Sequence, residues 1–106
     1  MSTSDGKTNA IISYLTIIGT VIALVMNNEK KNALAAFHIR QTLGLFLTHF
    51  ALGYFVSVFD SWLATQIFWG ILAVCWLIGF SGAVTGVERK IPILGDLYQK
   101  LFKSIP

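Results

Sequence analysis

Charge is scarce in this sequence, and the residue arrangements that enzymes use are missing. Only 12% of its 106 residues are Asp, Glu, Lys or Arg, about half the share that is usual in a soluble domain. The five acids are scattered singly along the chain. We find no Ser–His–Asp set and no glycine-rich phosphate loop after a strand. We therefore expect a protein that is not an enzyme and that uses no cofactor.

Cysteine is almost absent as well, which excludes an internal disulfide. The single Cys75 lies inside an apolar run, where a thiol ordinarily serves as a small packing residue. No Cys/His cluster with metal-ligand spacing accompanies it, so we expect no metal site. The net charge is +3, but the Lys and Arg residues lie in short segments between apolar runs. This pattern favours contact with anionic lipid headgroups over a nucleic-acid partner.

Apolar residues are abundant and occur in long runs. Hydrophobic residues make up 55% of the chain, and the mean hydropathy is +0.68. Three runs, at about 8–26, 33–59 and 65–87, are compatible with the roughly 20 helical residues that cross a bilayer. Short polar breaks predict an all-α membrane protein: one domain over residues 1–106, with three transmembrane helices in an antiparallel bundle. No small-x-small cleavage pattern follows the first run, which favours a retained helix over a signal peptide.

A short amphipathic helix is predicted after the third run. Pro92 stops a helix that arrives from upstream. Asp96 can cap a new helix, with Gln99 in the capping-box position. Apolar residues then recur at helical spacing over about 96–104. This helix is too short to span, so we expect it to lie in the membrane interface or to pack against the bundle or a partner.

The distribution of basic residues predicts an orientation. Lys7 is the only basic residue on the expected N-terminal side, where the second break contributes Asp60. The positive-inside rule then places the N-terminus outside and the C-terminus in the cytoplasm, with Tyr14 and Trp62 near the outer interface. Seven basic residues fall on the cytoplasmic side: Lys30, Lys31, Arg40, Arg89, Lys90, Lys100 and Lys103. All of them except Arg40 are candidates for lipid-headgroup contact.

The second apolar run carries the most unusual residues. At 100° per residue, Arg40 points almost opposite to a polar helix face. That face is formed by His38, Gln41, Thr42, Thr48 and His49. Polar groups within a membrane usually face protein or water. One interpretation is a seam that contacts a partner helix, a substrate segment or a water-filled path. The other is internal hydrogen bonding that fixes how the helices pack.

His49 lies deeper in this run than the other polar residues. A neutral imidazole at this depth needs a hydrogen-bond partner, and the candidates are Thr16, Thr20 and Gln66. A proton-relay role is an alternative. No acidic residue within the apolar runs accompanies the histidine to support that role.

Glycines mark one side of the third run. Gly82 and Gly86 form a GxxxG pair one turn beyond Gly79, and such a ridge lets two helices approach closely. Gly44 in the second run is a further candidate for helix packing. The close contacts can lie within the chain or between copies of it.

Two segments resemble a known family. AFHIRQTLGL at 36–45 and ERKIPILGDLYQKL at 88–101 are similar to signatures of small bacterial membrane proteins related to the Tic20-like chloroplast import component. The resemblance implies an α-helical, multi-pass protein of the bacterial inner (plasma) membrane, whose plant relatives take part in protein import. The positions that match the family motif are His38, Arg40, Gln41, Gly44, Pro92 and Gly95.

Three functions are compatible with these features. The first is a non-enzymatic accessory subunit of a larger inner-membrane, protein-transport-like complex, bound through the polar helix face and the basic cytoplasmic layer. The second is a homo-oligomeric channel or transporter subunit, in which His38, Gln41 and His49 line a wet path. The third is a lipid-binding, membrane-shaping protein that acts through its C-terminal amphipathic helix. The expected partners are the bilayer and either a larger membrane complex or further copies of the chain, without nucleic acid.

Overall fold

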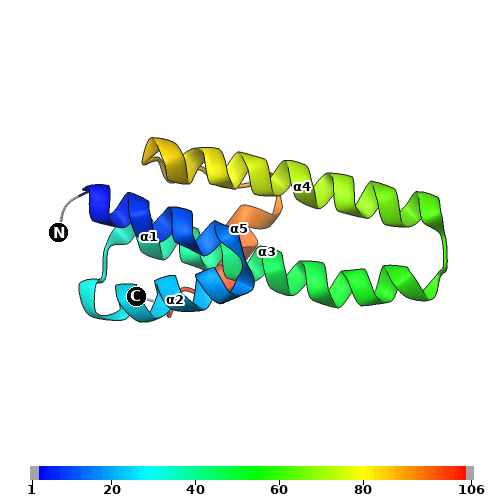
Figure 1. Ribbon diagram of the computed structural model, residues 1–106, viewed down its shortest axis with the longest axis horizontal. Coiled ribbons are helices and arrows are strands. Elements are labelled where there is room, and N and C mark those ends of the chain that lie inside the picture. The colour runs from blue at the N-terminus through cyan, green and yellow to red at the C-terminus, as the bar shows by residue number, and fades with distance from the viewer. Residues whose placement is uncertain (1–2, 105–106) are drawn as a thin grey trace.

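The structure, a computed structural model, describes residues 3–104, which form five helices and no strand (Figure 1). The helices are α1 (Thr3–Leu15), α2 (Ile17–Lys30), α3 (Ala33–Val58), α4 (Trp62–Thr85) and α5 (Leu94–Leu101). The molecule is elongated, with principal extents of 47 × 23 × 22 Å. The all-α class predicted from the sequence is confirmed for these residues.

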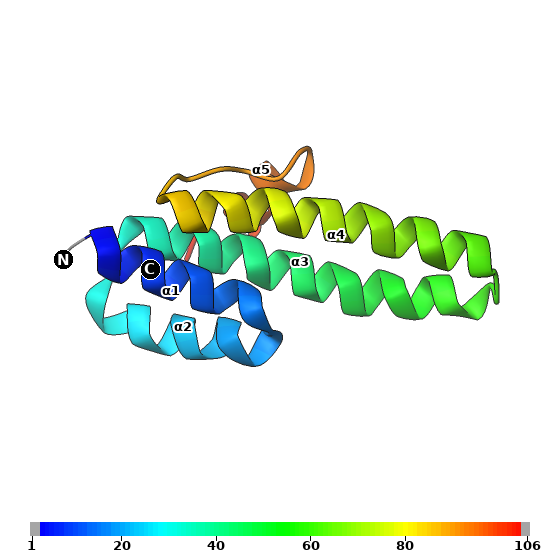
Figure 2. The same ribbon diagram turned by 45° about the horizontal axis from the view of Figure 1, so that its top comes forward.

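The long axis of the molecule is formed by α3 and α4, which lie side by side and antiparallel (Figure 2). With 26 and 24 residues, they extend about 39 and 36 Å at 1.5 Å per residue. Both are long and apolar enough to cross a membrane. Side-chain caps explain where they begin. Asn32 accepts a hydrogen bond from the Ala35 amide at 3.1 Å, and Ser61 accepts one from the Ala64 amide at 3.2 Å.

The first apolar run does not form the continuous helix expected over residues 8–26. The chain leaves the helix at Thr16 and turns back, so that α2 packs antiparallel on α1 (Figures 1 and 2). Thr16 has an extended backbone, and its hydroxyl accepts a hydrogen bond from the Gly19 amide at 3.1 Å. This bond caps α2. A methyl group on Gly19 would collide with the Ile12 carbonyl oxygen, so the close turn requires glycine.

Two helices rather than three are therefore long and apolar enough to span a membrane among the described residues. The helices α1 and α2 have 13 and 14 residues, which is about 20 Å each, against a hydrocarbon core of about 30 Å. The predicted bundle of three transmembrane helices is not confirmed. The α1–α2 hairpin covers only one half of the α3–α4 hairpin (Figure 2). The uncovered half, residues 46–71, contains no buried residue and is called the distal hairpin below.

The start of α1 lies at the same end of the molecule as the α2–α3 turn and the end of α4. Gly6 abuts the Asn32 side chain, and a methyl group on Gly86 would lie 3.3 Å from Cδ of Lys7. The expectation that Lys7 lies opposite the other basic residues is therefore wrong. Its physical cause is the break at Thr16, because the first run crosses half the molecule twice instead of the whole molecule once.

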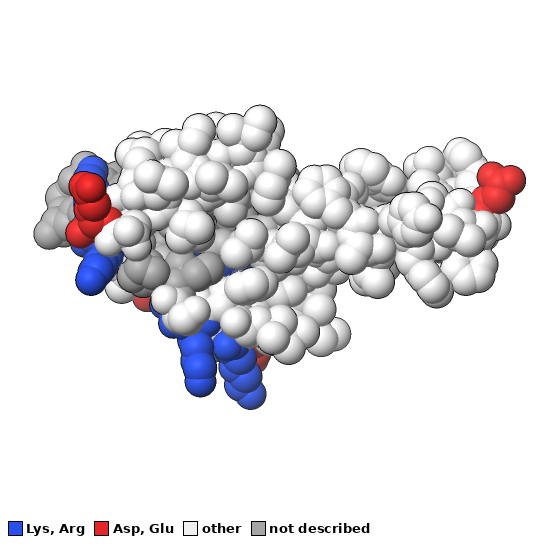
Figure 3. Space-filling view, turned by 90° about the horizontal axis from the view of Figure 1, so that it is seen from below, with Lys and Arg blue, Asp and Glu red and all other residues white. Residues whose placement is uncertain are grey.

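Charged residues gather away from the distal hairpin. Asp60, in the turn between α3 and α4, is the only charged residue between Arg40 and Glu88. In Figure 3 the narrow distal end shows acidic surface at its tip and no basic surface, whereas basic side chains project from the broad end. With α3 and α4 across a bilayer, all eight Lys and Arg residues would lie toward one membrane face.

The packing of α2 is inverted relative to a water-soluble bundle. Its buried side is small or polar, with Gly19, Thr20, Ala23 and Asn27. Its outward side carries large apolar residues at helical spacing, all roughly half exposed or more: Ile18, Val21, Ile22 and Val25. Large apolar residues outside and polar residues inside suit lipid surroundings. This inversion supports a membrane setting independently of helix length.

The chain after α4 returns along the α3–α4 hairpin. Gly86 closes α4 with a left-handed backbone (φ 76°), which glycine adopts without strain. Residues 87–91 are not helical and are called the strap below. The strap leads to α5, where the Tyr98 ring lies on Gly44 of α3 and the Tyr98 hydroxyl is 2.6 Å from that of Thr48. Thus α5, the expected amphipathic helix, packs against the bundle.

Candidate functional site

Seven polar side chains are buried together where α1, α2 and α3 meet. Each is at most 1% exposed, and the set is Asn9, Ser13, Thr20, Asn27, His38, Gln41 and Thr42. A buried polar group left without a hydrogen bond costs about 1–3 kcal/mol. The partners of these groups therefore decide whether they are available for a ligand, a path or another protein.

His38 uses both of its ring nitrogens inside the chain. Nε2 lies 2.9 Å from the Val87 carbonyl oxygen, and Nδ1 lies 2.8 Å from the Tyr14 hydroxyl. A carbonyl oxygen can only accept, so Nε2 carries the proton and Nδ1 accepts from Tyr14. The contacts thus define one tautomer of a neutral imidazole, which ties α1 and α3 to the strap.

Gln41 is the second residue that holds the strap. Its Nε2 donates to the Arg89 carbonyl at 3.1 Å, and its Oε1 accepts from the Ile91 amide at 2.9 Å. The same Nε2 donates to the Tyr14 hydroxyl at 2.7 Å. Backbone groups outside helices must find partners when they are buried. Together, His38 and Gln41 supply three such partners to a segment with no helix of its own.

Tyr14 is the hub that sequence reasoning missed. It was expected near the outer interface, but it is fully buried and contacts both His38 and Gln41. Its carbonyl oxygen accepts from Trp76 Nε1 at 2.8 Å, which is possible because α1 ends one residue later and leaves that carbonyl without a helical partner. The break at Thr16 therefore creates the site that orients Trp76.

The remaining polar residues of the motif also bond within the chain. The Thr42 hydroxyl donates to the Ile39 carbonyl at 3.1 Å and lies 3.5 Å from that of Thr20. Arg40 points toward α5, where its NH1 group is 3.4 Å from Gln99 Oε1. Gln99 donates in turn to the Phe37 carbonyl at 2.9 Å. Arg40 thus helps to dock α5 on α3.

The glycines leave room for these contacts. A side chain at Gly79 would collide with the Tyr14 hydroxyl and the Gln41 amide, and one at Gly82 with the strap backbone. Gly44 accommodates the ring of Tyr98, and Gly86 is the left-handed cap of α4. The small residues therefore serve packing within one chain, which was one of the two alternatives open for them.

His49 is separated from the rest of the polar face. Among the described residues neither of its ring nitrogens forms a hydrogen bond. Thr20, one of its expected partners, instead donates to the Ser13 carbonyl at 2.7 Å. The His49 ring packs edge-on against Trp69, with centroids 4.3 Å apart, and stacks on Phe68 at 5.8 Å. The polar face thus divides into a satisfied inner part and one isolated imidazole.

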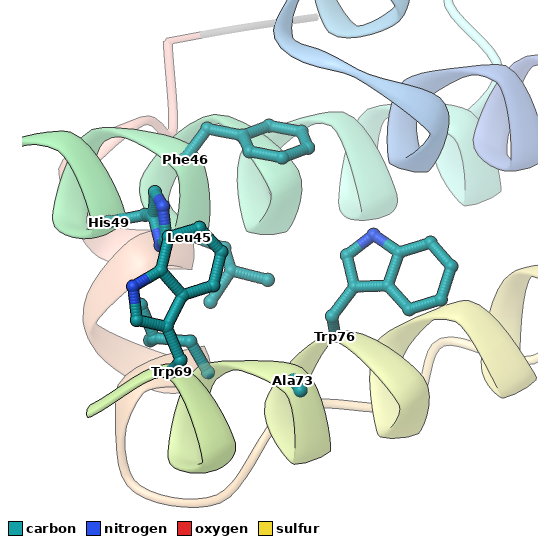
Figure 4. Close-up of a pocket in the computed structure, with 7 residues that line it drawn as sticks. Leu45, Phe46, His49, Trp69, Ala73 and Trp76 are labelled. Carbon is teal, nitrogen blue, oxygen red and sulfur yellow. The ribbon is translucent and has the colours of Figure 1, made fainter. Parts of the chain in front are cut away.

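A cavity of about 260 Å³ lies beside His49, where the distal hairpin meets the covered half (Figure 4). Phe46 and Trp76 lie at one end of it, and His49 and Trp69 at the other. Leu45, Leu72 and Ala73 complete its lining. The lining is therefore mostly apolar. Its polar groups are the His49 imidazole and the indole N–H groups of Trp69 and Trp76, and the Trp76 N–H donates to the Tyr14 carbonyl.

The six headgroup candidates lie in the part of the molecule that carries the charge. All six are exposed: Lys30, Lys31, Arg89, Lys90, Lys100 and Lys103. Lys90 pairs with Asp96 at 2.7 Å, and this hydrogen bond holds the pKa of the Asp96 carboxyl below its usual value. Both side chains of the pair are more than half exposed on the surface of the molecule.

No group of side chains that could hold a metal ion is found in residues 3–104. No three of the His, Cys, Asp and Glu residues there lie close enough to hold a metal ion. No protein-family model, curated protein or solved structure matches this chain. The resemblance to the Tic20-like family stays a prediction.

Proposed function

We propose that this chain is a non-enzymatic accessory subunit of a larger membrane complex. It is anchored by α3 and α4 and docks through the outer surface of the distal hairpin. Its basic end faces the cytoplasm, following the positive-inside rule. With the start of α1 beside Gly86, the N-terminal segment faces the cytoplasm too. A bacterial inner membrane and a protein-transport complex are the setting that the family resemblance implies.

The observation that carries this proposal is the contrast between the two halves of the molecule. Most buried polar groups of the covered half are bonded within the chain, through His38 and Gln41 above all, and among the described residues the Asn9 side-chain amide nitrogen is an exception. The distal hairpin has only two helices, and its outward apolar residues include Phe55, Leu63 and Ile67, each more than half exposed. A two-helix surface of this kind gains packing contacts from neighbouring helices, which drive helix association in lipid.

The same contacts argue against the channel hypothesis. Two of the three residues that would line a wet path, His38 and Gln41, are fully buried, with their polar atoms occupied by the strap and Tyr14. Only His49 is left for a path. Opening one through the other two would break several internal hydrogen bonds in each copy.

Purification from the native membrane tests the proposal. The tagged chain would be solubilised in mild detergent, and the mass of the intact assembly would be measured by native mass spectrometry. We expect a larger membrane protein in fixed stoichiometry with this chain. A lone homo-oligomer would reject the accessory-subunit proposal and bring back the channel hypothesis, which conductance measurements with His49→Leu would then examine.

A further inference from the structure

The cavity beside His49 has the properties of a ligand site rather than of a packing defect. It is bounded on the α3 side by Phe46 and His49 and on the α4 side by Trp69 and Trp76 (Figure 4). Its volume of about 260 Å³ is well above that of an apolar cavity of about 150 Å³ that takes up benzene. A six-membered ring with substituents therefore fits between its aromatic walls.

His49 lies near the middle of the bilayer when α3 spans it. Val58, the last residue of α3, is nine residues further on, or about 14 Å at 1.5 Å per residue. Half of the hydrocarbon thickness is about 15 Å. A polar group at this depth has no water to bond with. Since no described residue bonds the His49 ring nitrogens, an occupant with a hydrogen-bonding atom would remove that penalty.

These two observations restrict the occupant. A lipid acyl chain fills apolar space but offers no hydrogen-bonding atom to His49. A transmembrane helix is about 10 Å across with its side chains, so its backbone cannot enter a cavity of this size. A flat ring with one oxygen satisfies both requirements, because its faces can pack on Trp69 and Trp76 while the oxygen bonds the imidazole.

We propose that the cavity binds a membrane-soluble ring ligand of the alkylated benzoquinone class, with a ring oxygen hydrogen-bonded to His49. The alkyl or isoprenoid tail extends into the lipid, because Trp69 and Ala73 leave the α4 side of the cavity exposed. Binding alone is proposed, and no electron transfer is involved. The proposal does not depend on the accessory-subunit function, since it concerns the isolated chain.

Tryptophan fluorescence measures this binding directly, because quinones quench indole emission and two of the three tryptophans line the cavity. The protein with Trp62→Phe, which removes the third, is placed in phosphatidylethanolamine–phosphatidylglycerol nanodiscs and titrated with a decyl-substituted benzoquinone. Ala73→Leu fills the cavity, and Ala51→Leu is its matched control, because Ala51 is exposed on α3 outside the lining. His49→Leu removes the hydrogen bond, with Gln66→Leu on exposed α4 surface as its control.

We expect saturable quenching in the parent protein and in both controls. Ala73→Leu should abolish the saturable component, and His49→Leu should raise the half-saturating concentration about five-fold, as the loss of one hydrogen bond predicts. Quenching that rises linearly, or that is equal in Ala73→Leu and Ala51→Leu, would overturn the proposal. It would mean that the probe only dissolves in the bilayer and that the cavity takes an acyl chain or a partner's side chain instead.

Discussion

Replacing Gln41 by leucine should release the strap. The substitution removes three hydrogen bonds, to the Tyr14 hydroxyl, the Arg89 carbonyl and the Ile91 amide. Hydrogen bonds between helices in a membrane average about 0.6 kcal/mol, and net values in proteins reach about 1.5 kcal/mol. Three of them give a loss of about 2–4.5 kcal/mol in the free energy of unfolding. Leucine has a similar size, so most of this loss comes from unbonded backbone groups rather than from an empty space.

Limited trypsin digestion in nanodiscs measures how readily the strap opens. Trypsin cleaves after Arg89 and Lys90, which are exposed but lie in the segment that Gln41 holds. Two of the lost bonds hold the strap. If their loss lowers the free energy of local opening by about 1.4 kcal/mol, the open form becomes ten times more populated, and cleavage that requires opening becomes ten-fold faster. We therefore expect cleavage there to accelerate about ten-fold or more, while cleavage after Lys30 and Lys31 stays unchanged.

The matched control is Gln66→Leu, which makes the same chemical change on an exposed α4 position. It should leave the cleavage rate and the unfolding free energy of the parent protein unchanged. Equal rates for Gln41→Leu and Gln66→Leu would refute the reasoning, because the amide of Gln41 would then not hold the strap.

Three further predictions concern other parts of the fold. Gly44→Leu should expel the Tyr98 ring from α3 and undock α5. The amides of α5 should then exchange hydrogen faster, and unchanged protection of these amides would contradict the packing of α5 on α3. Thr16→Ala should lose the α2 cap and about 1 kcal/mol of stability, measured by denaturant unfolding in detergent, and no loss would count against the helix break. The Lys90 hydrogen bond lowers the pKa of the Asp96 carboxyl in the folded chain. The pair therefore stabilises the fold at pH values above the carboxyl pKa of the unfolded chain, and this contribution is lost as the pH falls through the lowered pKa of the folded chain. Lys90→Gln should raise that pKa in an NMR titration, and an unmoved value would exclude the ion pair.

Part of the fold could be read from the sequence because local signals decided it. The second run contains no proline and no charged residue after Arg40, and Asn32 before it is an ordinary capping residue. The next helix begins at Trp62, three residues before the predicted start at about 65, because the Ser61 hydroxyl caps it. The helical periodicity of α5 was likewise sufficient to predict a short amphipathic helix, although α5 begins at Leu94 rather than Asp96.

The break at Thr16 could not be read with the same ease. Isoleucine, leucine and threonine on both sides of it are compatible with one long helix, and the deciding contacts are tertiary. A weak signal was present: Thr8, Asn9 and Ser13 make the first part of the run too polar for a full membrane span. Because these residues were included in the apolar run, the sequence predicted a third transmembrane helix and placed Lys7 on the wrong side of the membrane.

The polar face of α3 was predicted, but its partners were not. Helical geometry places His38, Gln41 and Thr42 together, and all three are buried. What bonds them depends on Tyr14, whose position follows from the missed hairpin. It also depends on the strap, which has no periodicity to reveal its path. For the same reason the sequence could not show that His49 is left alone.

Site-specific photo-crosslinking in the native membrane tests the central claim most directly. A photoreactive amino acid would replace Leu52 on the distal hairpin or Val25 on the outer side of α2, both exposed and apolar. We predict one discrete crosslinked membrane protein from position 52 and only lipid or diffuse products from position 25. The same discrete product from both positions, or none from position 52, would contradict docking through the distal hairpin.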